Sequence, residues 1–322
     1  MKYFLGADVG SSKTQILIAD EKGRTVGFGF AGPGNHQTVG YNGMFSALQR
    51  GVNKALTEAG ISVKDISGAG FGISGYDWPS DKPRMLEIIT RLGLQAPLEM
   101  HNDAVLGLVA GAEDGWGIAV VSGTGCNCWG WDKDRGQIGR VTGFGDLTGE
   151  AAGSTELVYR AMQLVAYAWT KRGQETALTQ GFIDCVDAKD IVDLLEGYTT
   201  DHYQIDGNAA PLVFQVAEKG DPVARQLLHW AGSELGELAQ AVIRQLNFQS
   251  LKFDVVMVGS MFEGGQLLID PMRQTIQQLA PGARLVRLSV PPAVGALLIG
   301  MQAGGLQPTP EIHKTLIGSF AS

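Results

Sequence analysis

The sequence lacks three features that would each indicate a different class of protein. No stretch of the 322 residues approaches the roughly 20 apolar residues of a membrane span. The apolar run at residues 3–7 is too short for a signal peptide and leads directly into Asp8. An excess of positive charge is also missing, since the formal net charge is -8, which disfavours nucleic-acid binding. We therefore expect a cytoplasmic protein with neither a membrane nor a nucleic-acid partner.

Cysteine is scarce as well. The three residues Cys126, Cys128 and Cys185 form an odd, low count, which predicts reduced thiols in a cytoplasm. Cys126 and Cys128 have the spacing of half a metal site, but no second Cys or His pair stands at ligand spacing. The favoured interpretation is that both are small residues filling a strand.

Glycine, by contrast, is abundant at 45 residues and gathers at the ends of apolar runs, which is typical of turns. Short apolar runs alternate with segments of helical periodicity, and this indicates an α/β fold. Expected strands cover residues 4–7, 15–19, 25–30, 66–73, 98–102, 116–121, 127–131 and 253–258. Expected helices cover residues 44–59, 83–92, 104–112, 156–171, 188–196, 210–218, 222–246 and 291–303.

One supersecondary pattern occurs twice. Residues 3–26 read as strand, Gly/Ser turn, strand and charged Gly turn, and residues 116–136 repeat this order. The repeat predicts two domains with a boundary near residue 115. We expect an N-terminal domain of residues 1–115, joined by the C-terminal helix within 291–322, and a C-terminal domain of residues 116–290.

Three glycine turns that follow strands are candidates for binding a nucleotide. Glycine lets backbone N–H groups approach phosphate closely, and neighbouring hydroxyls add donors. Each turn alone could be a plain hairpin, and the GxxxxGK[ST] spacing of a Walker A loop is absent. Together they favour a clamp on ATP. Its expected residues are Gly10, Ser11, Ser12 and Lys13 in the first turn, Gly123, Thr124 and Gly125 in the second, and Gly259 and Ser260 in the third.

Two carboxylates stand where strands end. Asp8 precedes the first turn and could hold Mg²⁺ through water as a hard oxygen ligand. Asp103 stands between an expected strand and an expected helix, where partial burial would raise its pKa toward that of a general base. Asp103 could also cap the helix at 104–112, and on spacing alone the cap is the stronger interpretation.

Two loops could supply polar contacts to a sugar. Asn35 and His36 follow the rigid turn Gly32-Pro33-Gly34, and Glu150 ends the Gly-rich segment 143–150. A surface loop without a ligand is the alternative for both.

Five motifs in order, GADVGSSKT, HNDA, VVSGTGCNC, GFGDLTGEAAGS and VMVGS, resemble the N-acetylglucosamine and glucosamine kinase branch of the BadF/BadG/BcrA/BcrD ATPase family. The resemblance implies two actin-like (ribonuclease H-like) domains with a nucleotide and sugar cleft between them. It also implies ATP- and Mg²⁺-dependent phosphorylation of an amino sugar at its 6-hydroxyl by a homodimer. The roles it implies are Asp103 as base, Asp8 for the metal, Ser12 and Thr124 for phosphate, Asn35, Asn127, Gly145 and Glu150 for the sugar, and Gly259, Ser260 and Ala210 for the nucleotide.

Two departures from the family pattern bear on the substrate. The first turn reads Gly10-Ser11-Ser12 where the family often has GGT, and the loop at 149–154 is one residue longer and has Glu150 in the Asp position. The rivals are an ATPase that activates a partner enzyme through an iron–sulfur cluster, a non-enzymatic actin- or Hsp70-like module, and a ROK sugar kinase. The cysteine spacing disfavours the activating ATPase. The absence of an appended peptide-binding domain disfavours the actin- or Hsp70-like module, and the absence of a Cys-rich zinc motif disfavours the ROK kinase.

Overall fold

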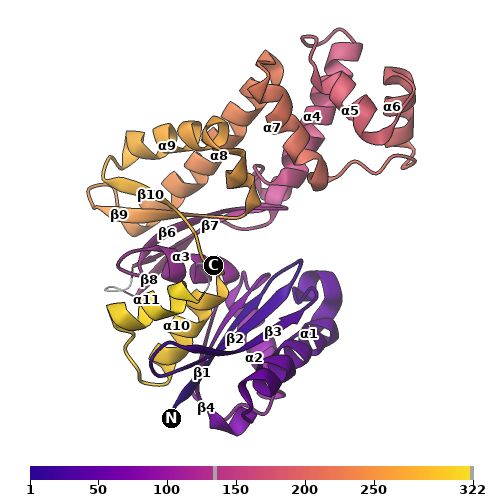
Figure 1. The fold of residues 1–322 in the computed structure, drawn as a ribbon. Coiled ribbons are helices and arrows are strands. Elements are labelled where there is room, and N and C mark those ends of the chain that lie inside the picture. Colours follow the sequence, from indigo (N-terminus) through magenta and orange to yellow (C-terminus); the bar gives the residue numbers. More distant parts are fainter. Residues whose placement is uncertain (133–135, 320–322) are drawn as a thin grey trace.

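The computed structural model describes residues 1–132 and 136–319, which are organised around two five-stranded sheets (Figure 1). The strand order of the first sheet is β3-β2-β1-β4-β5. Strands β1, β2 and β3 pair antiparallel, whereas β4 lies parallel to β1 and β5 lies parallel to β4. Their bounds are β1 (Tyr3–Val9), β2 (Thr14–Asp20), β3 (Thr25–Ala31), β4 (Ile66–Ile73) and β5 (Leu98–His101).

The second sheet repeats this topology. Its order is β10-β9-β6-β7-β8, with an antiparallel meander of β6, β7 and β8 followed by the parallel strands β9 and β10. The bounds are β6 (Gly117–Ser122), β7 (Cys126–Asp132), β8 (Gln137–Arg140), β9 (Phe253–Val258) and β10 (Ala283–Arg287). The α/β class and the duplication predicted from the sequence are therefore confirmed.

Helices cover both faces of the first sheet (Figure 1). Helix α1 packs on β2 and β3, while α10 packs on β1 and β4 from the other side. Helix α3 contacts α10 and also β6, β7 and β9, so it lies between the two sheets. The bounds are α1 (His36–Ala59), α2 (Lys82–Thr90), α3 (Asp103–Gly111), α10 (Ala293–Ala303) and α11 (Pro310–Gly318). Because α10 packs on the first sheet, the chain returns to its N-terminal half at its end.

The remaining helices belong to the second half. The long helix α8 packs on β6, β7 and β8 and against α9, whereas α4 to α7 extend away from the sheet (Figure 1). Their bounds are α4 (Ser154–Trp169), α5 (Leu178–Val186), α6 (Ile191–Thr199), α7 (Ala210–Glu218), α8 (Pro222–Leu246) and α9 (Gln266–Leu279). No described helix is both long and apolar enough to cross a membrane.

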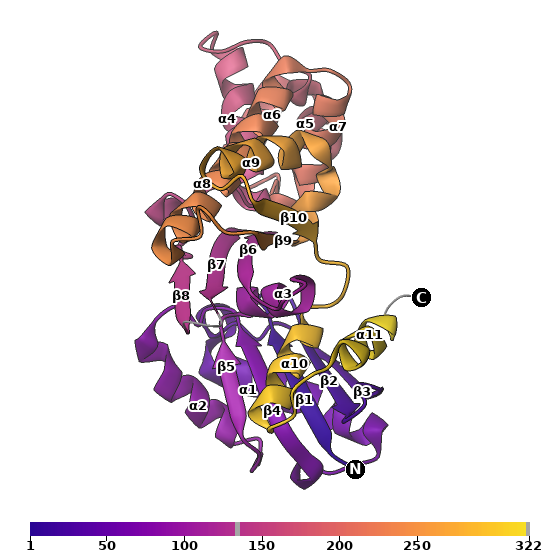
Figure 2. The ribbon, with the colours of Figure 1, turned by 90° about the vertical axis from the view of Figure 1, so that its left-hand side faces the viewer.

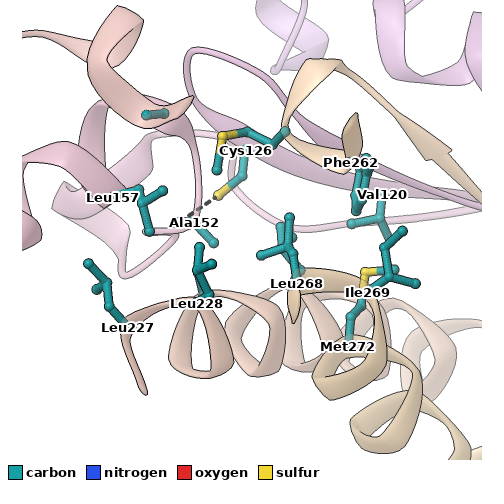
Figure 3. Close-up of a cluster of buried hydrophobic side chains, with 14 of the residues drawn as sticks. Val120, Cys126, Ala152, Leu157, Leu227, Leu228, Phe262, Leu268, Ile269 and Met272 are labelled. Carbon is teal, nitrogen blue, oxygen red and sulfur yellow. Dashed lines mark hydrogen bonds between the residues drawn. The ribbon is translucent and has the colours of Figure 1, made fainter. Parts of the chain in front are cut away.

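The core of the second half includes Cys126, whose side chain points into a cluster of buried apolar residues (Figure 3). Its sulfur accepts a hydrogen bond from the backbone N–H of Ala152 at 3.3 Å. Burial raises the pKa of the Cys126 thiol to about 12, and the pKa of the fully buried Cys128 is also raised. Both cysteines thus fill the interior of β7, in line with the interpretation as small strand residues.

Three expectations about elements need correction or remain open. Helix α1 begins at His36 rather than residue 44, because Asn35 caps it, and it continues past a break at Gly40 with φ 68°. The periodicity predicts neither α9, whose interior holds Pro271, nor the short edge strands β8 and β10. Residues 133–135 of the expected charged turn lie outside the described residues, and the domain boundary near residue 115 stays a prediction.

Candidate functional site

A pocket of about 300 Å³ lies where strand ends from the two halves of the chain face one another. From the first half it is lined by the turns after β1 and β4 and by the start of α3. From the second half it is lined by the turn between β6 and β7 and by Gly143. The sequence-predicted site residues that it brings together are Ser11, Asn35, Asp103, Gly123, Thr124, Gly125 and Asn127.

Asp103 enters this pocket from the first turn of α3, but it is not the residue that caps the helix. The N-cap is Asn102, whose side-chain oxygen accepts a hydrogen bond from the N–H of Ala104 at 3.0 Å. The N-cap of α3 is therefore Asn102 and not Asp103, so the stronger interpretation from spacing alone is wrong. An acidic residue in the first helical turn is also favoured by the helix dipole.

Burial is the main cause that raises the pKa of Asp103, to about 6, and the nearby Asp77 carboxylate raises it further. Hydrogen bonding from the Ser74 hydroxyl and from the backbone works in the opposite direction. A carboxylate that is ionised at neutral pH and still basic enough to accept a proton is suited to general-base catalysis.

Asp8, near the end of β1, does not line the pocket and is only 9% exposed. Burial raises its pKa to about 7, the charge of Asp103 raises it further, and that of Lys13 lowers it. Asp8 and Asp103 are thus two interacting carboxylates with raised pKa values. A cation bound near them would favour the ionised form of both.

Magnesium fits this arrangement only as an ion that takes most of its ligands from water and from the substrate rather than from the protein. In residues 1–132 and 136–319 no group of three or more His, Cys, Asp or Glu side chains could hold a metal ion. Mg²⁺ usually keeps several waters and binds through one or two carboxylates together with substrate phosphates. The buried Asp8 carboxylate meets that requirement.

The first glycine turn presents Ser11 rather than Ser12 to the pocket. The Asn35 side-chain amide donates to the Ser11 hydroxyl at 2.9 Å, and that hydroxyl lies 3.1 Å from the hydroxyl of Ser74. The turn is closed by a hydrogen bond from the Gly10 N–H to the Lys13 carbonyl at 2.9 Å. Ser12 and Lys13 are exposed outside the pocket wall.

The sequence interpretation missed Asp77, which is 7% exposed and lines the same pocket. It accepts hydrogen bonds from the side-chain amides of Gln37 and Asn102, each at 3.2 Å. Asn102 thus ties Asp77 to the start of α3, beside Asp103. Ser74-Gly75 follows strand β4 much as glycine turns follow β1 and β6, which marks this strand end, but nothing local singles out Asp77 itself.

The second turn is held from behind by helix α4. The N–H groups of Ser154 and Thr155 donate to the carbonyls of Gly123 and Thr124 at 2.8 and 3.1 Å. Gly153, just before the helix, lies so close that a Cβ on it would come within 2.4 Å of the Cα of Gly125. The turn is therefore fixed against α4, with the Thr124 side of the turn exposed toward the pocket.

The third turn lies beside the second but outside the pocket. Gly259 has a φ of 112°, and a Cβ there would come within 2.1 Å of the Ser122 carbonyl oxygen. Gly259 and Ser260 are exposed, whereas Ala210 is buried at the start of α7. These three predicted nucleotide contacts do not line the pocket around Asp103.

Three predicted sugar contacts also lie outside the pocket wall. The His36 ring stacks on Tyr41, with ring centroids 4.7 Å apart. The Glu150 carboxylate is buried and accepts hydrogen bonds from the Thr142 hydroxyl and from the Thr142 N–H, the latter at 2.7 Å. Gly145 accepts through its carbonyl from the Glu150 N–H, and it is Gly143 that reaches the pocket, next to Asn127.

Comparison with known proteins bears on what such a pocket does. The sequence model of the BadF/BadG/BcrA/BcrD ATPase family matches residues 5–300. An N-acetylmuramic acid/N-acetylglucosamine kinase of Clostridium acetobutylicum is 28% identical over 93% of this chain and 98% of its own length. An N-acetyl-D-glucosamine kinase of Dictyostelium discoideum is 26% identical with the same two coverages.

A solved structure agrees with these relatives. The protein is from Chromobacterium violaceum, was provisionally assigned as an N-acetylglucosamine kinase, and is 25% identical with a TM-score of 0.68. The alignment covers 93% of this chain and 99% of that one. A ROK family glucokinase from Streptomyces griseus, solved with glucose and AMPPNP, shares the fold at 21% identity and a TM-score of 0.58, over 93% of this chain and 98% of its own.

Proposed function

Because the chain belongs to the BadF/BadG/BcrA/BcrD ATPase family, we propose that it is an ATP-dependent kinase that phosphorylates an amino sugar, N-acetylglucosamine above all, on the 6-hydroxyl. The observation that carries the proposal is the place of Asp103. This carboxylate is not the N-cap of its helix, has a raised pKa, and faces the second glycine turn across one pocket. A base opposite a phosphate-binding turn is what phosphoryl transfer to an alcohol requires.

The pocket residues divide between the two substrates. Asn35 is held by its bonds to Ser11 and to the Gln37 N–H, so it offers the sugar a fixed polar edge. The backbone of Gly123, Thr124 and Gly125 faces the same space and would receive the terminal phosphates of ATP. Asp103 then accepts the proton of the sugar hydroxyl as its oxygen attacks the γ-phosphorus and the bond to ADP breaks.

Asp8 would hold Mg²⁺ through water. When bound, this ion neutralises charge on the transferred phosphate. The predicted contacts of Gly259, Ser260 and Ala210 with the nucleotide, and of Glu150 with the sugar, belong to the same proposal. One observation supports a nucleotide role for Gly259. It lies against the end of strand β6, which leads into the proposed phosphate turn.

Glucosamine or another hexose is the alternative acceptor, because the loop at 149–154 departs from the family pattern and one oxygen of the Glu150 carboxylate bonds to Thr142 within the protein. An activating ATPase with a shared iron–sulfur cluster is disfavoured, since Cys126 and Cys128 are buried in the protein core. We also propose a cytoplasmic homodimer. Tyr159 and Trp169 on α4, each about half exposed, are candidates for its interface.

A coupled assay of ADP release tests the proposal. The protein would be mixed with MgATP and with N-acetylglucosamine, glucosamine, glucose or N-acetylmannosamine in turn. We expect N-acetylglucosamine to raise ADP release well above the rate without sugar. The kinase proposal fails if none of the sugars does so.

A further inference from the structure

One buried carboxylate in the pocket of Asp103 has no part in the proposed mechanism. Asp77, on the loop after β4, lines this pocket and also a larger cavity of about 760 Å³ beside it. That cavity lies between β5 and β8, the edge strands of the two sheets, which face one another in Figure 2. Asp77 therefore lies where the two halves of the chain meet, beside the space proposed for the sugar.

Hydrogen bonds within the first half fix the position of the Asp77 carboxylate. One oxygen accepts from the side-chain amide of Gln37 and the other from that of Asn102, each at 3.2 Å. The backbone N–H of Asp77 donates to the Asp81 carboxylate at 3.2 Å, which holds the loop. Because each carboxylate oxygen can accept two hydrogen bonds, both oxygens of Asp77 keep the capacity for a further donor.

The surroundings of Asp77 favour the binding of such a donor. Burial raises the pKa of Asp77, and the hydrogen bond from Gln37 and the charge of Arg140 offset this rise only in part. Arg140 acts at a distance, since Asp77 forms no ion pair with any residue in 1–132 or 136–319. A buried carboxylate without an ion pair is stabilised by each hydroxyl that donates to it.

Across the pocket, the second half presents a donor to the same space. The side-chain oxygen of Asn127 accepts from the Cys128 N–H at 2.8 Å, which fixes the amide and identifies its NH₂ as the group beside Gly143. A Cβ on Gly143 would lie 3.1 Å from this nitrogen and 3.5 Å from Oδ1 of Asp77. The space that this glycine leaves open is therefore shared by one donor and one acceptor, and a hydroxyl group there can accept from Asn127 and donate to Asp77.

The position of Asp103 indicates which sugar hydroxyl this is. In the proposed reaction Asp103 accepts the proton of the 6-hydroxyl, and Asp77 lies close enough for its charge to act on Asp103. Asn102, the residue before Asp103, also donates to Asp77. On a hexopyranose ring the hydroxyl nearest to the 6-hydroxyl is the one on C4, because C4 is bonded to the carbon that carries C6. A carboxylate beside the base is therefore expected to meet the 4-hydroxyl.

We propose that Asp77 and Asn127, from opposite halves of the chain, bind the 4-hydroxyl of the sugar and make the enzyme selective for acceptors in which this hydroxyl is equatorial, as it is in N-acetylglucosamine. The proposal rests on the proposed sugar kinase activity and adds the residues that recognise the configuration at C4. The hydroxyl donates to Oδ1 of Asp77 and accepts from the amide of Asn127. A sugar whose 4-hydroxyl is axial or missing leaves the buried carboxylate without this donor.

The probes for the test are N-acetylglucosamine, its 4-deoxy and 3-deoxy derivatives, and N-acetylgalactosamine, the epimer at C4. Steady-state kinetics and calorimetric binding would compare wild type with Asp77→Asn, Asn127→Ala and Asp81→Asn. Asp81→Asn is the matched control, because it removes the same charge from the same loop and Asp81 lines neither cavity. Its amide oxygen can still accept from the N–H groups of Asp77 and Trp78. The melting temperature of each variant shows whether the fold is kept.

We expect wild type to bind and use the 4-deoxy sugar and N-acetylgalactosamine about tenfold to 100-fold less well than N-acetylglucosamine, the effect of a hydrogen bond to a charged group. Asp77→Asn should lower kcat/KM and affinity about tenfold more for N-acetylglucosamine than for the 4-deoxy sugar. The 3-deoxy sugar should lose as much as N-acetylglucosamine, and Asp81→Asn should behave like wild type. A loss common to all the sugars is the effect of the Asp77 charge on Asp103, whereas the difference between sugars is the contact.

Three results would overturn the proposal. Equal losses for N-acetylglucosamine and the 4-deoxy sugar would show that Asp77 does not contact the 4-hydroxyl. A loss that vanishes only with the 3-deoxy sugar would place Asp77 at the neighbouring hydroxyl, and a wild type that uses N-acetylgalactosamine as well as N-acetylglucosamine would show no selectivity at C4. If Asp77→Asn does not fold, Asn127→Ala gives the same comparison from the other half.

The outcome for this contact can be separated from the outcome for the kinase. If no sugar is turned over but binding shows the difference that depends on Asp77, the contact stands and the kinase proposal fails. If N-acetylglucosamine is turned over and the difference is absent, the contact fails alone.

Discussion

Asn102 caps helix α3 in place of its neighbour Asp103: the Asn102 side-chain oxygen accepts from the Ala104 N–H, while its amide donates to Asp77. One residue thus anchors the helix and links the two carboxylates that face the pocket. The position of Asp103 depends on this neighbour, because Asp103 is the first residue of the helix that Asn102 caps.

Asn102→Ala should lower both stability and catalysis. Loss of a side-chain N-cap costs about 1 kcal/mol, and Asp103 would lose the anchor of its helix. The matched control is Asp190→Ala, which removes the cap of α6 far along the chain from the pocket residues. Urea unfolding should show that the free energy of unfolding falls by a similar amount in the two variants, whereas kcat should fall only for Asn102→Ala. A similar kcat for both would mean that the cap does not position Asp103.

The rate should depend on pH through Asp103, which must be ionised to accept a proton. Because its pKa is raised to about 6, kcat/KM should fall as the pH drops below 6. Ser74→Ala removes hydrogen bonding that favours the ionised form, so it should move this midpoint to higher pH. The check is a pH–rate profile of both proteins. A midpoint near the ordinary value of 3.8 would argue against the buried base.

Asp8→Asn should stabilise the ligand-free protein at high pH while it weakens the enzyme. The folded pKa of Asp8 is raised from 3.8 to about 7, so the folded form holds the proton more tightly. Stability is therefore greatest below the unfolded pKa and is lost as the pH rises through about 7. At pH 8 the free energy of unfolding of the variant should exceed that of wild type by about 1 kcal/mol or more. Urea titrations at pH 5 and pH 8 measure this, and a variant less stable at pH 8 contradicts it.

Gly123→Ala should weaken ATP binding without loosening the fold. A Cβ at Gly123 meets nothing within 4 Å in the protein and its φ is not positive, so the added methyl group faces only the space for phosphate. We expect KM for ATP to rise about tenfold at an unchanged melting temperature. Gly153→Ala is the contrasting variant, because its Cβ would come within 2.4 Å of Gly125 and should destabilise the protein. An equal fall in melting temperature for the two variants would contradict this difference between Gly123 and Gly153.

Much of the fold could be predicted from local sequence, because strand ends and helix periodicity are local signals. Helix α8 spans Pro222–Leu246, as its periodicity and the proline at its start predict. Strands β4 and β9 also have their expected bounds. Helix α9 was missed since its interior proline suggests a break, and β8 because a four-residue edge strand has little periodicity.

The pocket was predicted in part for a different reason. Residues at strand ends, such as Asp103 and Thr124, can be found because parallel strands end at one edge of a sheet. Asp77 and Gln37 could not be ranked in this way, since their importance comes from hydrogen bonds across 25 to 40 residues of chain. The same holds for Glu150, whose carboxylate turns inward to Thr142, a contact that loop composition does not reveal.

The most direct test of the central claim is kcat of Asp103→Asn with MgATP and N-acetylglucosamine, measured beside calorimetric binding of the sugar. The substitution keeps the size of the side chain and removes its ability to accept the proton. We predict a fall in kcat of about 10² to 10⁴, the usual contribution of a general base, with sugar affinity changed only a few-fold. An unchanged kcat would show that Asp103 is not the base of this enzyme.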